Sequence, residues 1–331
     1  MVEIKRINTA FDLPENWDLL AENYFQKRKF LQHAETYNFC NQRYYLLKND
    51  DIILASAIVY TLRLDIFTFL RIKSPLKMHI VGIPCSVSSQ GIFGEKNKVK
   101  QLKEYILQSE KGFLLFLNLN EFPAENYIAK GKTLPTIVLK NQFDDWEHYV
   151  SSLRHAYRRR IKQLTEQNET LCFQKMKSNE FTELMYKQYL EVFYHSNDKL
   201  EKLTYVFFKN LPEEFILTVC LKNNVVLGWN LAVEDEKTYY FFLGGIDYKQ
   251  NKQNSTYLRL LTQLVQDGIA QKTTYIELGQ TAEIAKMRMG GKPEELYMQA
   301  THSNKMINFL LKKFAPLLDY KPKFEKTNAI K

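Results

Sequence analysis

Three side chains in the C-terminal half of the sequence can move a proton or hold a charge beside a substrate. Glu277 stands at the end of an apolar strand pattern, where a carboxylate can serve as a general base. Lys286 follows in a polar segment and can hold a carboxylate or phosphate, or polarise a carbonyl. Asp247 follows an earlier strand pattern and can orient or deprotonate an amine. Each has a plainer interpretation: an outward-facing strand charge, a surface lysine and a turn residue, respectively.

A second set of residues is placed to bind the rest of a substrate. Gly244 and Gly245 expose backbone where a strand pattern stops, and a strand-terminating bulge explains the same pair equally well. Gln280 and Arg288 lie on either side of Lys286 in one polar segment. Tyr257 opens the helical pattern that follows the first strand.

Two regions are candidates for anion binding. Ser255 and Thr256 precede the helical pattern, and the helix N-terminus together with Lys252 can face a phosphate, although capping alone also accounts for the two hydroxyls. Farther upstream, Arg158 and Arg159 belong to a cationic helical segment, WEHYVSSLRHAYRRRIKQ. A guanidinium group is well matched to phosphate or carboxylate, so this segment predicts binding of RNA or a nucleotide-linked substrate, with a solvated helix face as the alternative.

Hydrophobic periodicity predicts the elements that position these residues. Residues 238–243 form an apolar strand pattern, residues 247–255 a polar loop, and residues 273–278 a second strand. Apolar residues at three- and four-residue steps predict a helix between them: Tyr257, Leu258, Leu261, Leu264, Val265 and Ile269. Strand, polar loop, helix and strand, with glycines where strands end, is typical of an α/β fold in which the sheet opens to admit a ligand.

The same plan occurs earlier in the chain. YYLLKNDDIILASAIV matches FILTVCLKNNVVLGWNLAV if one Asp is treated as an insertion, so that Lys48 falls on Lys222. In both halves a further strand, a helix and another strand follow, which predicts two copies of one unit. Coincidence is the alternative, because KN turns between apolar strands are common. We expect domains at residues 1–140 and 141–331, with residues 136–139 closing the first as a short strand.

Composition narrows the class of protein. The chain has 331 residues, a hydrophobic content of 45% and a formal charge of +9, which suits two globular domains and attraction to anions. The four cysteines form no C-x-x-C pair and no H-E-x-x-H motif occurs, so no metal site is predicted. The N-terminus has no apolar signal region, and Arg63 and Asp65 interrupt the most apolar window. These features predict a soluble cytoplasmic protein with no stable membrane insertion.

Four passages resemble the tandem-GNAT, FemABX-like acyl- and aminoacyltransferases, especially the branch labelled peptidoglycan-biosynthesis-like or GNAT-family N-acetyltransferase. They are WEHYVSSLRHAYRRRIKQ, YHSNDKLEKLTYVFFKNLP, FFLGGIDYKQNKQNSTYL and IELGQTAEIAKMRMGGKPEEL, and they cover about residues 140 to 300 in the family's order. The resemblance implies an α/β (α+β) fold with two tandem GNAT-like domains, each a mixed, mainly antiparallel sheet flanked by helices. It also implies a donor-binding opening between the fourth and fifth strands of a domain.

The resemblance implies transfer of an acyl group from a thioester such as acyl-CoA to a small-molecule amine, by direct attack and without a metal. On this reading Glu277, Lys286 and Asp247 are catalytic, and the second domain carries the active site. One passage departs from the family, because YKQNKQNSTY has no glycine where typical GNAT domains bind the CoA pyrophosphate on a glycine-rich turn. Acetyl-CoA as donor is therefore in question. The alternatives are an aminoacyl-tRNA donor, or a non-catalytic module that binds RNA or an acidic surface.

Overall fold

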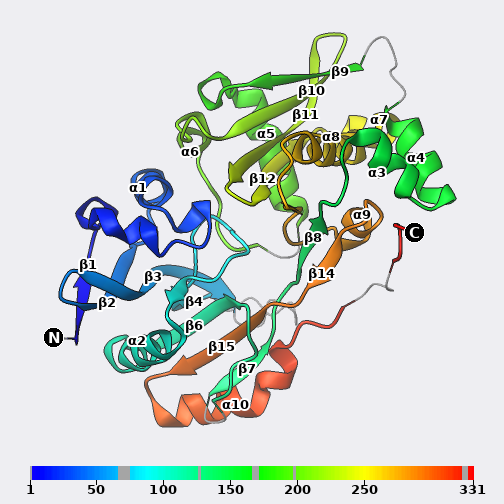
Figure 1. Ribbon diagram of the computed structural model, residues 1–331. Coiled ribbons are helices and arrows are strands. Elements are labelled where there is room, and N and C mark those ends of the chain that lie inside the picture. The colour runs from blue at the N-terminus through cyan, green and yellow to red at the C-terminus, as the bar shows by residue number, and fades with distance from the viewer. Residues whose placement is uncertain (1, 66–74, 126–127, 166–170, 197–198, 323–326) are drawn as a thin grey trace. The chain divides into compact units, whose positions relative to one another are not determined.

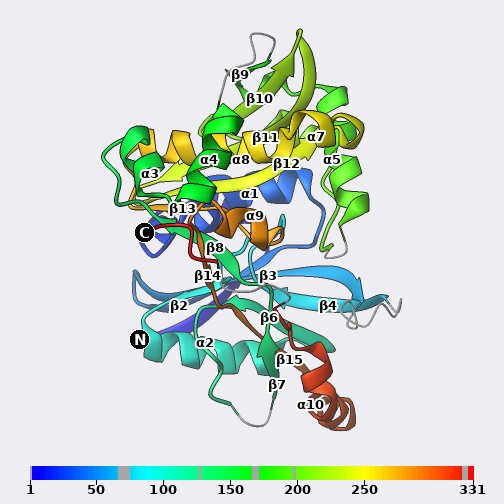
Figure 2. The same ribbon diagram turned by 90° about the vertical axis from the view of Figure 1, so that its right-hand side faces the viewer.

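The computed structural model describes residues 2–65, 75–125, 128–165, 171–196, 199–322 and 327–331 (Figures 1 and 2). The chain forms two compact units. Unit 1 comprises Met1–Pro135 and Glu295–Pro322, and unit 2 comprises Thr136–Glu294 and Lys323–Lys331. The two units therefore exchange segments and are not separated by a single boundary between residues 140 and 141.

Unit 1 is built on one mixed sheet. Its described strands run in the order β1 (Val2–Ile7), β2 (Arg43–Asn49), β3 (Ile52–Asp65), β4 (Pro75–Val81), β6 (Phe113–Leu119), β15 (Tyr297–His302) and β7 (Ala129–Lys132), and β5 (Ile92–Gly94) also pairs with β3. Neighbouring strands are antiparallel except for β4 and β6, which are parallel. Parallel strands need a long crossover, and the chain between β4 and β6 contains β5 and helix α2 (Lys96–Ser109).

Apolar side chains from the sheet and one face of α2 form the core of unit 1. Leu102 and Ile106 of α2 are fully buried against Val59, Val81 and Phe116 of the sheet. The other helical elements of unit 1 are η1 (Ala10–Asp12), η2 (Glu15–Leu19), η3 (Tyr24–Gln26), α1 (Arg28–Tyr37) and α10 (Lys305–Leu318).

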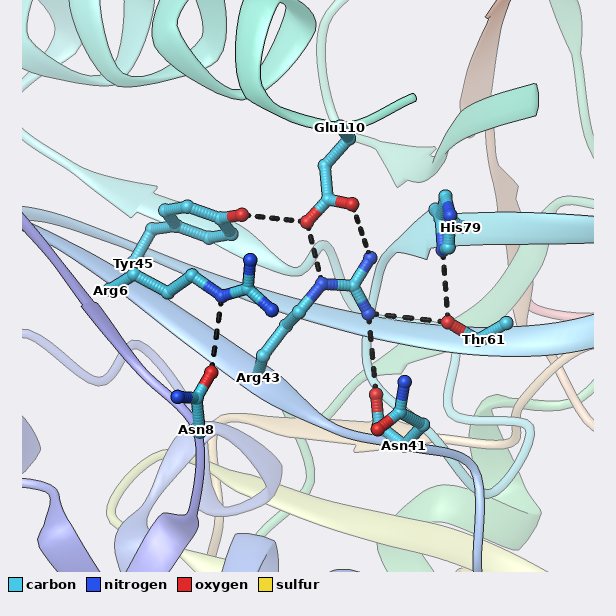
Figure 3. A network of polar contacts seen from close by, with 8 residues as sticks. All are labelled: Arg6, Asn8, Asn41, Arg43, Tyr45, Thr61, His79 and Glu110. Carbon is cyan, nitrogen blue, oxygen red and sulfur yellow. Dashed lines mark hydrogen bonds and ion pairs between the residues drawn. The ribbon is translucent and has the colours of Figure 1, made fainter. Parts of the chain in front are cut away.

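A buried ion pair joins the C-terminus of α2 to this sheet (Figure 3). Arg43 donates two hydrogen bonds of 2.6 Å to the carboxylate of Glu110, and Tyr45 donates a third of 2.6 Å to the same group. Thr61 links Arg43 to His79 through contacts of 3.2 Å and 2.9 Å. Burial by itself would raise the pKa of Glu110, but the hydrogen bonds from Arg43 and Tyr45 outweigh it and hold that pKa below its usual value.

Unit 2 is also built on one mixed sheet. Its described strands run in the order β14 (Lys292–Glu294), β8 (Thr136–Lys140), β13 (Tyr275–Glu277), β12 (Thr238–Ile246), β11 (Val225–Asp235), β10 (Ile216–Lys222) and β9 (Leu171–Met176). Only β12 and β13 are parallel among these pairs. Helix α8 (Thr256–Ala270) makes the crossover between them, as the periodicity predicts.

Helices α5 (Glu183–His195) and α8 cover opposite faces of this sheet. Trp229 of β11 donates a hydrogen bond of 2.9 Å to the carbonyl of Met185 in α5, whereas a Cβ on the preceding Gly228 would meet Thr256 of α8. Consecutive strand residues face opposite sides, so the two contacts place the helices on the two faces. The other helical elements that the structure describes in unit 2 are α3 (Trp146–Ser152), α4 (His155–Thr165), η5 (Ser178–Glu180), α6 (Tyr205–Lys209), α7 (Tyr248–Asn254) and α9 (Glu283–Met287).

The predicted duplication is confirmed by the two sheets. Hairpin β2–β3 in unit 1 corresponds to hairpin β10–β11 in unit 2, and each is followed by a strand, a helix and a parallel strand. The KN turns have the left-handed backbone that tight hairpins require, at Asp50 in the first copy and at Asn223 and Asn224 in the second.

Each unit takes one strand from the other half of the chain, which the sequence analysis did not predict. Residues 136–139 were expected to close the first domain, but they lie in β8, which pairs with β13 and β14 of unit 2. In the same way β15, from the end of the chain, lies between β6 and β7 of unit 1. Local patterning marks a segment as a strand, whereas its partners are decided by tertiary contacts.

Candidate functional site

The candidate site in unit 2 lies where β12 and β13 diverge. The two strands pair in register only over three positions, and Tyr240 with Glu277 is the last pair. Strand β12 continues to Ile246, whereas β13 ends at Glu277. A register shift against β11 adds one extra residue to β12 next to Phe241, and such a bulge bends a strand. The pairing of the two strands therefore ends here, at the position where the sequence analysis expects the sheet to open.

Lys286 of α9 is the most unusual ionisable residue near this opening. Its side chain is 1% exposed. The Nζ atom donates a hydrogen bond of 2.6 Å to the carbonyl oxygen of Gln280 and lies 5.5 Å from the ring centroid of Phe241. Gly279 has a φ of +72°, and a Cβ there would stand 3.9 Å from Nζ. The turn after β13 thus brings the lysine back against β12.

Burial changes the acid–base behaviour of this lysine. Removal from water disfavours the ammonium form and lowers the pKa of Lys286 from 10.5 to about 7, although the carboxylates of Glu283 and Glu277 oppose the shift. The amine can therefore both gain and lose a proton near neutral pH. A group of this kind beside an opening in a sheet is suited to proton transfer.

Glu277 and Tyr240 form the end of the paired region. Thr136 of β8 donates a hydrogen bond of 3.0 Å to Oε1 of Glu277, which fixes this carboxylate at the strand end. Burial and the charge of Glu277 raise the pKa of the Tyr240 phenol, so the tyrosine stays protonated. The structure therefore brings Glu277 and Lys286, which the sequence analysis had singled out, into one electrostatic neighbourhood.

Asp247 lies elsewhere and has a structural contact. It is the N-cap of α7, and its carboxylate accepts hydrogen bonds from the backbone N–H groups of Lys249 at 2.9 Å and Gln250 at 3.3 Å. Residues 248–254 are thus helical, which corrects the expectation of a polar loop over residues 247–255. The pattern YKQNKQN has no apolar periodicity, so hydrophobic patterning does not predict this helix. The N-cap at Asp247 is the local signal that marks where it begins.

The expected anion-binding residues lie at the junction of α7 and α8. Ser255 has a left-handed backbone and makes no capping hydrogen bond with its side chain. Thr256 is fully buried, and its hydroxyl finds no hydrogen-bond partner in the described structure. The backbone N–H of Tyr257 is bound by the side chain of Asn251 at 2.9 Å, and Lys252 is exposed on α7. A protein side chain therefore already occupies one first-turn donor of α8.

The glycine pair and Tyr257 make packing contacts. Gly244 and Gly245 lie inside β12, which corrects the expectation that the strand ends there. A Cβ on Gly245 would stand 2.6 Å from the indole nitrogen of Trp229 and 2.8 Å from the backbone nitrogen of Tyr189 in α5. Tyr257 packs against the hydrophobic core on one side of the sheet, and burial raises the pKa of its phenol. Gly245 therefore allows α5 to approach the sheet closely.

A cavity of about 320 Å³ lies among α4, α8 and α9. Its lining is mainly apolar and consists of Tyr157, Ile161, Leu258, Ala282, Ile284, Ala285 and Met289, together with the charged residues Arg160, Glu283 and Arg288. Cavities of this size and character commonly hold small ligands or parts of cofactors. Arg288, at the end of α9, therefore lines this cavity, whereas Arg158 and Arg159 of α4 are not among its lining residues.

Sequence reasoning missed three residues that the structure brings to these sites: Phe241, Thr136 and Arg160. Phe241 follows from the strand pattern only if the bulge in β12 is known, because the bulge decides which side of the strand it faces. Thr136 reaches Glu277 through the exchanged strand β8. Arg160 was noted only as one of several cationic residues in a helix.

Two general features complete the description. Within the described residues, no group of three or more His, Cys, Asp or Glu side chains is arranged to hold a metal ion. None of the helices in the described part of the chain is long and apolar enough to cross a membrane.

Comparison with known proteins places the fold. No protein-family model matches the sequence, and no curated protein shows significant sequence similarity to it. Among solved structures, FemX is similar with a TM-score of 0.54 at 8% identity, over 86% of this chain and 93% of FemX. A tandem GNAT protein from the clavulanic acid biosynthesis pathway gives a TM-score of 0.52 at 6% identity, over 92% of this chain and 99% of that one.

A conserved protein of unknown function from Bacteroides thetaiotaomicron is similar as well, with a TM-score of 0.50 at 11% identity over 91% of this chain and 99% of that one. These likenesses, together with the duplicated sheets, show that the chain has a FemABX-like tandem GNAT fold. The fold expected from the sequence is therefore confirmed.

Proposed function

We propose that this protein is an N-acyltransferase whose active site lies in unit 2, where β12 and β13 diverge. The observation that carries the proposal is Lys286, a buried lysine with a pKa of about 7 beside that opening. The left-handed turn at Gly279 and the carbonyl of Gln280 hold its amine against Phe241. A purely structural lysine gains little from burial that removes its charge at neutral pH.

In the proposed reaction the neutral amine of the acceptor attacks the carbonyl carbon of an acyl thioester. Lys286, in its neutral form, accepts the proton that the attacking nitrogen loses as the new C–N bond forms. The C–S bond then breaks, and the resulting ammonium group of Lys286 returns the proton to the leaving sulfur. Glu277 orients the acceptor amine by accepting a hydrogen bond. General acid–base assistance of this kind typically contributes about 10²- to 10⁴-fold to the rate.

The cavity among α4, α8 and α9 is the proposed site for the acyl donor. Its apolar lining suits an acyl chain or another apolar part of the donor, and Arg160 and Arg288 suit a phosphate or carboxylate on the same molecule. Because the segment before α8, which consists of α7 and Ser255, has no glycine and the N–H of Tyr257 is bound by Asn251, the donor's phosphates are proposed to bind these arginines and not the α8 N-terminus.

The first experiment tests donor binding. The melting temperature of the full chain is measured with CoA, acetyl-CoA and long-chain acyl-CoA, since a ligand at a hundred times its dissociation constant adds about 2.7 kcal/mol of stability. We expect stabilisation that grows with acyl length and is reduced in Arg288→Ala and in Ala285→Phe, which fills the cavity. Arg159→Ala is the matched control, because Arg159 is exposed on α4 and does not line the cavity. No shift with any thioester would exclude this donor class.

The second experiment tests the role of Lys286. Release of free thiol from the donor identified above is followed with a panel of primary amines across pH 5.5 to 8.5. We expect kcat/KM to rise with pH through about 7 in the wild type. Lys286→Arg, which stays charged, should lose about 10²- to 10⁴-fold of the rate while still binding the donor. Lys237→Met, at an exposed position in unit 2, is the control and should leave the rate unchanged.

An aminoacyl-tRNA donor is the second candidate, and the cationic residues of α4 favour it. Arg158, Arg159 and Arg160 are consecutive on this helix, and the chain carries a formal charge of +9. On this alternative, Arg158→Glu combined with Arg159→Glu abolishes RNA binding, and the affinity falls steeply with salt. Transfer that persists after ribonuclease treatment would exclude it. RNA binding without any acyl transfer would instead indicate a non-catalytic binding module.

A further inference from the structure

Helix α10 of unit 1 is apolar on two sides, and only one of them packs against the part of the chain that the structure describes. The helix lies against β7 and β15 (Figures 1 and 2), and its Leu311 is buried. On the outer side Met306 is 77% exposed, Phe309 67%, Leu310 49% and Phe314 43%. A globular helix normally presents polar residues on its solvent side, so this second apolar side needs an explanation.

The exposed apolar residues form a continuous stripe. Met306, Phe309 and Leu310 are three and four residues apart, and Phe314 follows four residues after Leu310, a spacing that places side chains along one face. The stripe extends over about 12 Å of the helix at 1.5 Å per residue. Four large side chains gathered in this way differ from the single exposed apolar residues that are normal on protein surfaces.

The charged residues of α10 itself have one sign. Lys305, Lys312 and Lys313 belong to α10, all three are exposed, and the helix contains no Asp or Glu. Lys313 points outward within the stripe, three residues after Leu310 and four after Phe309, and the other two lie along one edge of it. Long lysine side chains can keep their ammonium groups in a polar layer while their methylene stems lie on an apolar one. Apolar residues accompanied only by lysines complement a surface that has an apolar interior beneath a negatively charged outer layer.

We propose that α10 docks this protein on the surface of a membrane that contains acidic lipids, with Met306, Phe309, Leu310 and Phe314 inserted at the headgroup boundary. The helix has 14 residues, too few to span a bilayer, and an amphipathic helix with lysines beside its apolar side lies in the plane of the interface. A second copy of the chain fits less well, because a symmetric contact would bring the lysines of both copies together. The proposal is independent of the catalytic one.

Co-sedimentation of the full chain with lipid vesicles tests this proposal. Vesicles of phosphatidylcholine alone are compared with vesicles in which about a third of the lipid is phosphatidylglycerol. We expect binding to the acidic vesicles only. Lys312→Glu with Lys313→Glu should weaken it by about 25-fold or more, from about fivefold per lysine, and Phe309→Ser with Leu310→Ser should abolish it.

Two matched controls distinguish docking through α10 from a general effect of net charge or of exposed apolar residues. Lys100→Glu with Lys237→Glu makes the same change in net charge elsewhere on the surface, and Leu19→Ser with Phe39→Ser removes two residues that are 85% and 91% exposed. Both control proteins should bind as the wild type does. Equal loss of binding in the controls and the α10 variants would refute the proposal, as would the absence of binding to acidic vesicles.

A measurement that leaves the stripe apolar covers the case in which the serine variant does not fold. In Phe309→Trp, lipids brominated on their acyl chains should quench the fluorescence of the new tryptophan. In Phe39→Trp, the fluorescence of the new tryptophan should remain unquenched. Equal quenching of the two would overturn the proposal. Light scattering adds one further outcome: a dimer that becomes a monomer on Phe309→Ser with Leu310→Ser would mean that a second copy covers the stripe, and the membrane proposal would be wrong.

Discussion

Lys286→Met should make the protein more stable at neutral pH and remove a specific pH dependence. The folded protein lowers the pKa of this lysine from 10.5 to about 7, so protonation is favoured in the unfolded chain. At 1.36 kcal/mol per pH unit, the buried amine destabilises the fold by about 4 kcal/mol at pH 7 and by about 1 kcal/mol at pH 10. Methionine fills a similar volume and avoids this cost.

The direction of the pH dependence follows from the number of protons that the folded and unfolded states bind. Between about pH 7 and pH 10.5 the unfolded state binds more protons at this site than the folded state, so the stability of the wild type rises with pH over that window. Methionine has no such dependence, and it also loses the hydrogen bond to the carbonyl of Gln280, worth about 1 kcal/mol. The variant should therefore be more stable than the wild type by about 3 kcal/mol at pH 7 and close to it at pH 10.

Urea unfolding at pH 6, 7, 8, 9 and 10 measures this difference. Trp146 and Trp229 lie in unit 2, so Trp17 of unit 1 is replaced by Phe in both proteins and the fluorescence then reports the unit that contains Lys286. Every other titrating group is common to the two proteins and cancels in the comparison. A stability difference that stays constant from pH 6 to pH 10 would refute the argument that burial has shifted the pKa of this lysine.

Three further predictions concern stability. Arg43→Ala should lower the free energy of unfolding by about 3 to 5 kcal/mol, because it leaves the buried carboxylate of Glu110 unpaired. Since the fold lowers the pKa of Glu110, the ion pair stabilises the protein above the pKa of an unfolded glutamate, and this stabilisation is lost as the pH falls. Urea titrations at pH 7 and pH 3 will measure the difference. Gly245→Ala should cost about 1 to 3 kcal/mol in thermal unfolding, because its Cβ would overlap the indole of Trp229; an unchanged melting temperature would contradict the close approach of α5. Asp247→Ala should cost about 1 kcal/mol through loss of the α7 cap, whereas loss of all acyl transfer at unchanged stability would show that this carboxylate has a catalytic role.

Some local sequence signals predicted the secondary structure correctly, and others did not. The helical spacing from Tyr257 to Ile269 predicted α8, and the KN turns predicted both hairpins, because period and turn chemistry are properties of a few neighbouring residues. Gly244 and Gly245 were read as the end of a strand. They lie within it, because α5 packs so closely there that no side chain fits.

The site shows the same division. The sequence pointed to Glu277 and Lys286 through their positions after a strand, and both lie at the opening of the sheet. It gave no sign that Lys286 is buried, because a lysine in a polar segment is ordinarily on the surface. Burial depends on Phe241 and on the turn through Gly279, which fold over the amine from two different elements.

By itself, the sequence determined the two hairpins, the strand–helix–strand unit from β12 to β13, the duplication and the family of folds, because each of these is encoded in periodicities and turns within a few tens of residues. Only the tertiary structure decided that β8 and β15 cross between the halves of the chain, since a strand's own pattern does not specify its partners. It also decided which charged groups are removed from water. Contacts between distant segments, and not residue type, moved the pKa of Lys286 toward neutrality and left the apolar stripe of α10 exposed.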